Sequence, residues 1–402
     1  MTPLRRLLTA RFLSACGDLL VPVAAPFAVL DDLHGGAAQI GLVLAAEFVG
    51  VLTFVVFGGA ITDRAPPVRV MVRADLAGAG FQAATAALLA SGVMTIPLFA
   101  ILMFAQGGAT AFFGPAVRVL VPQVAEAGGL QRANGLLGTV SAAATIVGPV
   151  LGGVLVAWPG APGAFAVNAL SFGVSLALTR GLVSTPGAKS VGLRLREGWG
   201  EVAGRPWLGG SILVAAGTEL LASGPLATAI PLVSRRIYGG ASSYGWLLSA
   251  LGVGAVLGGL AAARLPARRP VLAANLLIVP LAVVPLALRL EAPFGVALPA
   301  FALGGACQAA AGVMWNTALG LAVPRSALGR VASWDMLGSF ASRPLGQAFG
   351  GVLAGAAGTG PLLLLATASL VAVPLPILAL RDVRAPSRAG RPDASQPAPQ
   401  PG

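Results

Sequence analysis

The sequence contains few charged residues and few side chains that bind metals or form disulfides. Only 10% of its 402 residues are charged, and it has one histidine and two cysteines. This fraction of charged residues is too small to cover the surface of a water-soluble fold. His34 lies in a short predicted loop, and Cys16 and Cys307 lie in apolar stretches, so neither a metal site nor a disulfide framework is expected. With no nucleophile–base or H-E-x-x-H spacing, we expect no cofactor, no metal and no enzyme.

Long apolar stretches dominate the sequence instead. Twelve of them, mostly 18 to 26 residues long, could each cross about 30 Å of hydrocarbon as a helix. They cover residues 8–30, 38–61, 70–91, 96–117, 136–158, 163–180, 207–232, 243–263, 270–289, 293–315, 334–356 and 361–380. The sequence therefore predicts an all-α membrane protein with twelve transmembrane helices.

The basic residues lie in every second gap between these stretches. Of the 26 lysines and arginines, 22 fall at the two ends of the chain or in the even-numbered gaps. Cytoplasmic loops carry the excess of Lys and Arg in membrane proteins. We therefore expect a multi-pass protein of the cytoplasmic (inner) membrane, with both termini in the cytoplasm.

The net charge of +12 does not indicate a nucleic-acid-binding protein. The arginines are scattered singly and in pairs at helix ends, whereas a nucleic-acid site clusters them with aromatic residues. The first apolar stretch, from Leu4 to Leu30, is too long for the h-region of a cleavable signal peptide. We expect the partners to be the lipid bilayer, small molecules and protons, and the chain to act as a monomer.

The chain contains an internal repeat of about 200 residues. The matching segments are 58–69 with 258–269, 18–20 with 219–221, and 152–155 with 350–353. Parallel repeats of this kind build two-lobed secondary transporters whose substrate path lies between the lobes. We therefore expect two pseudo-symmetric lobes of six helices each.

The predicted lobes are residues 1–183 and 207–381, joined by a cytoplasmic linker at 184–206. Apolar and charged residues alternate near Trp199, so the linker is either a short amphipathic helix on the inner leaflet or a plain tether. The tail at 382–402 is rich in Pro, Ala, Gln and Ser, has nothing to bury, and is expected to be disordered.

A motif of glycines and charges lies between the second and third predicted helices. It consists of Gly58, Gly59, Asp63, Arg64 and Arg69. It resembles the cytoplasmic-loop motif of the major facilitator superfamily, although a Pro-Pro pair replaces the usual glycine or acidic residue. The resemblance implies that the aspartate accepts hydrogen bonds from a helix amino terminus of the other lobe and closes the cytoplasmic side. Ala263 replaces this aspartate in the second copy, so the lock is one-sided. Alternatively, these charges only set the topology.

A second motif, Gly148-Pro149-x-x-Gly152-Gly153, lies in the fifth predicted helix. It resembles the motif of the drug/proton-antiporter branch, and this resemblance implies export. Its small residues should form a smooth face against the eighth helix, and the proline should bend the fifth. The eighth helix offers Gly252, Gly254, Gly258 and Gly259 to this contact.

Three further segments, FFGPAVRVLVPQ at 112–123, LQRANGLLGTV at 130–140 and AFAVNALSF at 164–172, are the most family-specific. They resemble the twelve-span exporters that include the enterobactin exporters and the macrolide-efflux proteins. The resemblance covers essentially the whole chain and implies the major facilitator fold. It does not identify the substrate.

Two acids are predicted near the middle of the membrane, where an ionisable residue costs roughly 2.5–3.5 kcal/mol. Asp18 and Glu219 are equivalent positions of the repeat, in the first and seventh helices, which line the central cavity of the resembled fold. Either acid could bind a proton on one side of the membrane and release it on the other. Alternatively, each is a neutral acid hydrogen-bonded to a neighbouring helix.

Glu47 and Arg343 are predicted at similar depths in the second and eleventh helices. These helices meet across the lobe boundary in the resembled fold, so we expect an inter-lobe ion pair, unless each residue pairs within its own lobe or faces water. Glu47 is also a third proton-coupling candidate. Arg73 and Asp75, at the inner end of the third helix, are expected to support Asp63.

The sequence therefore predicts a proton-coupled exporter of small apolar or amphipathic molecules such as drugs, macrolide-like compounds or siderophores. The aromatic candidates for its cavity are Phe54, Phe81, Phe104, Trp246, Phe301 and Trp315, although single apolar residues more often serve packing. A selective lipid or metabolite carrier of the same fold and a non-transporting sensor remain alternatives. A channel would not need duplicated lobes with a one-sided gate.

Overall fold

The computed structural model describes residues 2–62, 65–126, 128–186, 195–266, 268–380 and 383. Every regular element in these ranges is a helix, as the apolar stretches predicted. The amino-terminal spans are α1 (Pro3–Asp18) with α2 (Val21–Phe27) and η1 (Ala28–Asp32), α3 (Ala37–Thr62), α4 (Pro67–Ala90), α5 (Ile96–Val124), α6 (Leu130–Ala157) and α7 (Ala161–Thr179).

The short helix α8 (Leu195–Ala203) precedes the second set of spans. These are α9 (Pro206–Thr218) with η2 (Glu219–Ser223) and α10 (Gly224–Ile237), α11 (Ala241–Arg264), α12 (Pro270–Leu276) with η3 (Val279–Ala282) and α13 (Val283–Arg289), α14 (Phe294–Ala322), α15 (Arg325–Ala357), and α16 (Thr359–Ala372) with η4 (Pro376–Ala379). The order of elements is therefore six spans, a connecting helix and a second set of six spans.

Ten of these spans are long and apolar enough to cross a membrane by themselves. The other two, α4 and α15, are 24 and 33 residues long and carry several charged residues. α15 begins at Arg325, nine residues before the apolar stretch from which it was predicted. Helix propensity does not stop at the edge of an apolar stretch, so the helix continues through the amphipathic segment before it.

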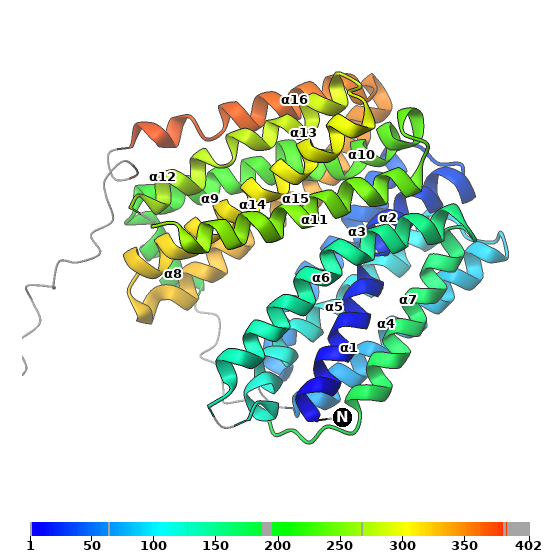
Figure 1. Cartoon of the computed structure of the whole chain (residues 1–402), viewed down its shortest axis with the longest axis horizontal. Helices are drawn as coiled ribbons and strands as arrows, with labels where there is room; N and C mark the ends of the chain where they lie inside the picture. The colour runs from blue at the N-terminus through cyan, green and yellow to red at the C-terminus, as the bar shows by residue number, and fades with distance from the viewer. Residues whose placement is uncertain are drawn as a thin grey trace, which may run out of the picture.

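The two lobes pack together near one end of the molecule and diverge toward the other (Figure 1). α6 packs against α11, and α3 packs against α15. The diverging ends carry the amino terminus in one lobe and α8 in the other (Figure 1). The helices of the two lobes therefore lie farther apart at the end that bears the amino terminus and α8.

Glycines bring the helix backbones of the two lobes into contact. A Cβ atom on Gly41 of α3 would overlap the Gln347 carbonyl oxygen of α15, and one on Gly351 would lie 2.7 Å from the Ala37 carbonyl oxygen. In the other pair of helices, a Cβ atom on Gly245 of α11 would overlap the Pro149 carbonyl oxygen of α6. Small residues permit such close crossings in membranes, where packing rather than the hydrophobic effect holds helices together.

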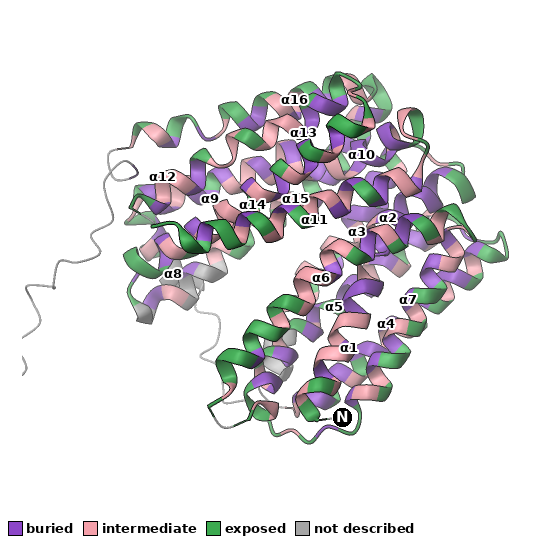
Figure 2. Cartoon of the chain, viewed as in Figure 1, coloured by how far each residue is buried: buried purple, intermediate pink, exposed green. Residues whose placement is uncertain are grey.

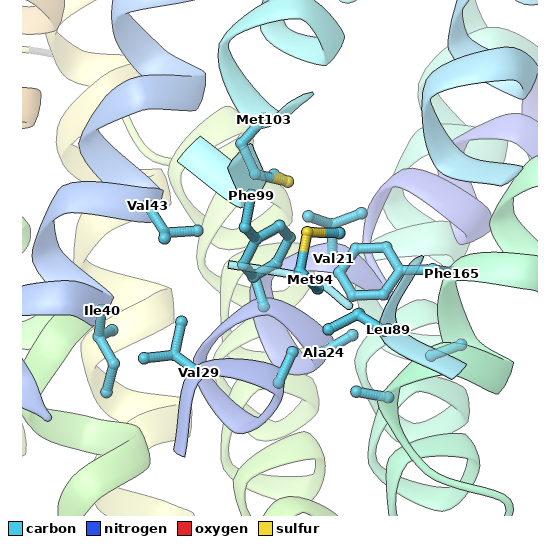
Figure 3. Packing of buried hydrophobic residues seen from close by; sticks show 14 of the residues in the cluster. Val21, Ala24, Val29, Ile40, Val43, Leu89, Met94, Phe99, Met103 and Phe165 are labelled. Carbon is cyan, nitrogen blue, oxygen red and sulfur yellow. The ribbon is translucent and has the colours of Figure 1, made fainter. Parts of the chain in front are cut away.

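An apolar cluster forms the core of the amino-terminal lobe (Figure 3). The rings of Phe99 and Phe165 lie edge to face, with centroids 5.7 Å apart, and Val21 and Ala24 of α2 pack beside them. Such aromatic pairs contribute about 0.5–1.5 kcal/mol beyond the area that they bury. This cluster fixes the second half of the first span against α5 and α7.

The outer surface of the helices is rich in exposed residues, many of them large and apolar (Figure 2). Leu76, Leu170 and Leu213, for example, are all more than 60% exposed. A water-soluble protein would rarely expose so much apolar surface, whereas hydrocarbon chains cover it in a bilayer. The exposed surface therefore fits a protein surrounded by lipid.

Residues 195–203 of the linker form a helix, whereas the placement of this helix on the inner leaflet stays a prediction. α8 packs against α15 and α9, and the indole rings of Trp199 and Trp334 have centroids 5.0 Å apart. Glu201 and Arg205 form an ion pair one turn apart. The linker residues 187–194 and the tail from Arg384 onward lie outside the described residues.

Candidate transport cavity

A cavity of about 310 Å³ lies between the two lobes. Its walls are mostly apolar, and its polar residues are Glu47 from α3, Ser223, Tyr244 and Gln308 from the second lobe, and Arg343 and Gln347 from α15. Pockets for small molecules combine apolar walls with a few polar groups that orient the ligand. The cavity therefore has the composition of a binding site for a small, largely apolar molecule.

Arg343 is the cation of this cavity and connects the two lobes. Its Nη1 lies 3.8 Å from Oε2 of Glu219 in its own lobe, and its guanidinium carbon lies 4.7 Å from the centre of the Phe48 ring in the other lobe. A guanidinium over an aromatic face is attracted by the ring quadrupole. Arg343 thus makes an ion pair within its lobe and a cation–π contact across the boundary.

The predicted inter-lobe ion pair between Glu47 and Arg343 is not formed in this arrangement. Both side chains line the cavity, but the described ion pairs join Arg343 to Glu219. Glu219 lies on the same lobe as Arg343, so this pair forms without bringing the lobes closer. The sequence placed the two charges at similar depths but could not show which of two acids is nearer to the cation.

The two midplane acids lie where their spans are interrupted. α1 ends at Asp18 and α2 begins at Val21, while α9 ends just before Glu219, where the wider turn η2 begins. Pro22 and Pro225 follow these breaks and have no N–H group to donate to the preceding turn. The repeat therefore reproduces the helix interruption as well as the acid.

Asp18 does not line the cavity between the lobes. It faces a smaller cavity of about 170 Å³ inside the amino-terminal lobe, together with Arg11 and Asp75. The hydroxyl of Ser175 on α7 donates a hydrogen bond of 2.7 Å to Asp75. Asp63 lies outside the described residues, so the expected support of Asp63 by Asp75 stays a prediction. Asp75 begins the third turn of α4, far enough along the helix to face the interior of its lobe.

Part of the predicted gate motif lies outside the described residues. This holds for Asp63, Arg64 and the surroundings of Gly58 and Gly59. Arg69 is exposed on the first turn of α4 and lines an apolar cavity of about 510 Å³ between α3, α4 and α5. The contact of the gate with the other lobe therefore stays a prediction.

The glycines of the antiporter-like motif face two different helices. Only Gly153 faces α11, where a Cβ atom would lie 2.8 Å from the Ala241 carbonyl oxygen. Gly148 and Gly152 face Leu19 and Leu20, at the interruption of the first span. Residues four apart share a helix face, whereas adjacent residues are turned by about 100°, which explains this division.

The glycines of the eighth span are divided in the same way. Of those expected to contact α6, Gly252 does, against Thr145. Gly254 and Gly258 instead pack on Ala302 and Ala306 of α14, and a Cβ atom on Gly259 would meet open space. Sequence reasoning missed Gly245, whose place next to the apolar Trp246 gave no sign of a close crossing.

None of the six aromatic candidates lines the cavity between the lobes. Phe54, Phe81 and Phe104 line the cavity between α3, α4 and α5, and Phe301 is buried in the core of the second lobe. Trp246 is 52% exposed on α11, and Trp315 donates a hydrogen bond of 2.9 Å to Asp335. The aromatic residues of the cavity are Phe48 and Tyr244. The chain has only two tyrosines, so the phenol of Tyr244 in an apolar stretch could have indicated a polar site from the sequence.

Solved transporter structures share this fold. A bacterial homologue of the human lysosomal transporter Spinster, in an inward-facing conformation, has a TM-score of 0.69 at 15% identity, with 94% of both chains covered. The nucleoside transporter NupG has a TM-score of 0.75 at 12% identity, covering 94% of this chain and 99% of that one. The predicted major facilitator fold is confirmed.

Curated relatives include proteins named multidrug efflux pump Tap. The protein of Mycolicibacterium fortuitum is 27% identical over 397 residues, which cover 94% of each chain. That of Mycobacterium tuberculosis (strain ATCC 25618 / H37Rv) is 30% identical over 176 residues, so the match spans 42% of each protein. The profile of one family, described as transmembrane secretion effector, matches residues 2–400. The chain belongs to this transmembrane secretion effector family of the major facilitator superfamily.

Proposed function

We propose that this protein is a secondary active exporter that moves small apolar or amphipathic molecules out of the cell in exchange for protons. The observation that carries the proposal is the cavity between the lobes, where apolar walls enclose Glu47 and Arg343, and Glu219 lies beside it as the ion-pair partner of Arg343. The name of its relatives, multidrug efflux pump, supports export of such molecules.

The charges in and beside the cavity favour a lipophilic cation as cargo. Arg343 can balance one of the two carboxylates, Glu219, and leaves Glu47 without a cation within ion-pair distance among the described residues. An unbalanced carboxylate in an apolar site is stabilised either by a proton or by a cationic ligand. The proton and the cationic cargo would compete for the same negative charge, so binding of either one would release the other.

The packing of the lobes supports transport by alternating access. The lobes are joined near one end and diverge toward the end with the amino terminus, which the distribution of basic residues assigns to the cytoplasm (Figure 1). This arrangement corresponds to a state open to the cytoplasm. Rocking about the glycine contacts would close that side and open the other, with the gate motif of Asp63 holding the closed form.

Purified protein reconstituted into liposomes tests the function. With an acidic lumen and the membrane potential held at zero by valinomycin and equal potassium on both sides, the liposomes should accumulate tetraphenylphosphonium, and a protonophore or equal pH on both sides should abolish the accumulation. Counterflow without gradient-driven accumulation would indicate an uncoupled carrier. Absence of both, for this cation and for an uncharged macrolide, would contradict the exporter proposal and favour a selective carrier or a sensor.

A further inference from the structure

Asp75 is a buried acid that the cavity between the lobes does not contain. Its side chain is 0% exposed. Oδ2 accepts the hydrogen bond from Ser175, but Oδ1 has no hydrogen-bond partner in the described structure. A buried oxygen without a partner is costly, so a group that supplies the missing hydrogen would stabilise it.

The cavity of about 170 Å³ brings Asp75 together with two other charged side chains. α1 contributes Arg11 and Asp18, whereas the lining residues from α5 and α7 are uncharged. Both Arg11 and Asp18 interact electrostatically with Asp75. The guanidinium of Arg11 also lies 5.4 Å from the centre of the Phe113 ring, which keeps it at the wall of this cavity.

The charges of this cluster do not balance when both acids are ionised. Two carboxylates face one guanidinium, so one negative charge would remain in the interior of a membrane protein. Uncompensated buried charge is strongly unfavourable, and a carboxyl group avoids it by holding a proton. We propose that Asp18, Asp75 and Arg11 form one proton-binding site whose exchangeable proton is shared between the two carboxyl groups.

The second lobe shows that an acid is not needed at this position for packing. Asn275 of α12 lies 200 positions after Asp75 and is also buried. Its amide donates to Ser211 at 3.2 Å and to the Val271 carbonyl at 2.9 Å. The amide of Asn275 therefore satisfies the packing at this position in the second lobe. The titratable carboxyl group of Asp75 in the first lobe is thus kept for a reason other than packing.

The site is electrostatically connected to the transport cavity. Asp18 repels Glu47, which lines that cavity. A cationic cargo beside Glu47 would offset this repulsion and favour the ionised form of Asp18, so that the shared proton is released. This step rests on the proposed proton-coupled export, whereas the composition of the proton site does not.

Infrared spectroscopy of the purified full-length protein tests the site without transport. The carbonyl band of protonated carboxylic acids, followed during a pH titration, should lose about one proton equivalent in Asp75→Asn, because Arg11 then balances Asp18. Asp18→Asn should lose the same equivalent, although Asp75 remains. Arg11→Gln should gain about one, because both acids are then unbalanced.

Ser175→Ala is the matched control, because it removes the hydrogen bond to Asp75 and leaves the charges unchanged. It should keep the full proton count. An unchanged count in Asp75→Asn combined with loss in Asp18→Asn would show that Asp18 titrates alone and would overturn the proposal. If Asp75→Asn does not fold, an unchanged count in Arg11→Gln would overturn it equally. If the variants show the expected proton equivalents but the protein does not transport cargo along a proton gradient, the export function is contradicted and the proton site is not.

Discussion

Asp31 and Arg235 form an ion pair of 2.9 Å that joins the two lobes. Asp31 belongs to η1 at the end of the first span, and Arg235 to the last turn of α10. α2, which leads into η1, and α10 lie near the end where the lobes are packed together (Figure 1). The pair therefore holds the lobes together at the end opposite to the amino terminus.

Breaking this pair should shift the protein toward states that are open at that end. Both side chains are about half exposed, and exposed pairs contribute about 0.2–1 kcal/mol. We therefore expect Asp31→Asn to raise the open population about 1.5- to 5-fold at low salt. Electron–electron resonance distances between labels at Gly36→Cys and Gly295→Cys would measure this.

Arg236→Gln is the matched control for Asp31→Asn. Arg236 pairs at 2.5 Å with Glu291 of the same lobe and is similarly exposed. This variant should leave the distance distribution unchanged. An equal shift in both variants would mean that the loss of any ion pair at this end, rather than the contact between the lobes, controls the opening.

A methyl group at Gly245 should weaken the contact between α6 and α11. The added Cβ would overlap the Pro149 carbonyl oxygen, and overpacking typically costs roughly 1–3 kcal/mol. We expect Gly245→Ala to lower the melting temperature and the transport rate. Gly259→Ala, on the same helix but in open space, should be neutral or slightly stabilising. Equal melting temperatures for the two variants would show that the helices can move apart without cost.

Removing the cation of the cavity should be more harmful than removing its aromatic partner. Arg343→Gln leaves Glu219 without its ion-pair partner, at a cost of about 1–3 kcal/mol, and should abolish coupled transport. Phe48→Leu removes only the cation–π contact, which contributes about 0.5–2 kcal/mol. The double variant Arg343→Gln, Glu219→Gln should regain part of the thermal stability that Arg343→Gln loses. No recovery would mean that Arg343 acts through the other lobe.

The overall architecture was predictable because it depends on averages over many residues. Twenty apolar residues in a row specify a span whatever their order, and a repeat of 200 residues remains visible from a few matched segments. The predicted spans and the two sets of six helices are accordingly present in the described chain. The helical part of the linker was one of two alternatives that the alternation of residues had left open.

The pairing of side chains was less predictable because it depends on helix rotation. Gly152 and Gly153 are adjacent in sequence but face different helices, and Arg343 pairs with Glu219 although Glu47 lines the same cavity. Asp75 was expected to support Asp63 because it lies at the inner end of the third predicted helix. The packed structure shows that Asp75 faces a cavity inside its lobe, whereas Asp63 lies outside the described residues and its support stays a prediction.

Neutralising the midplane acids should separate coupling from binding. Asp18→Asn mimics a permanently protonated acid, so accumulation of cargo against a gradient should be lost while binding of tetraphenylphosphonium persists. Glu219→Gln should reduce transport less, because Glu219 has Arg343 as a partner and Asp18 shares its cavity with a second acid. Cargo-driven proton release in detergent would compare them. Release equal to wild type in both would direct attention to Glu47.

The orientation in the membrane can be tested by chemical labelling. Cysteines at Gly36, Gly92 and Gly160 should react with impermeant maleimide in intact cells, because the basic residues assign their loops to the outside. Cysteines at Ala188 and Ser387 should react only after permeabilisation. Reaction at Ala188 in intact cells would reverse the assigned topology.

The glycine crossings also determine how far the lobes can travel. Backbone contacts such as Gly41 with Gln347 place no long side chains between the helices, so we expect α3 and α15 to rotate about this crossing in the proposed alternating-access cycle. The part of α3 from Gly41 to Thr62 forms a lever arm of about 30 Å, so each rotation of about 10° moves its tip by about 5 Å. A small angular change at one end is thus converted into an opening of molecular width at the other.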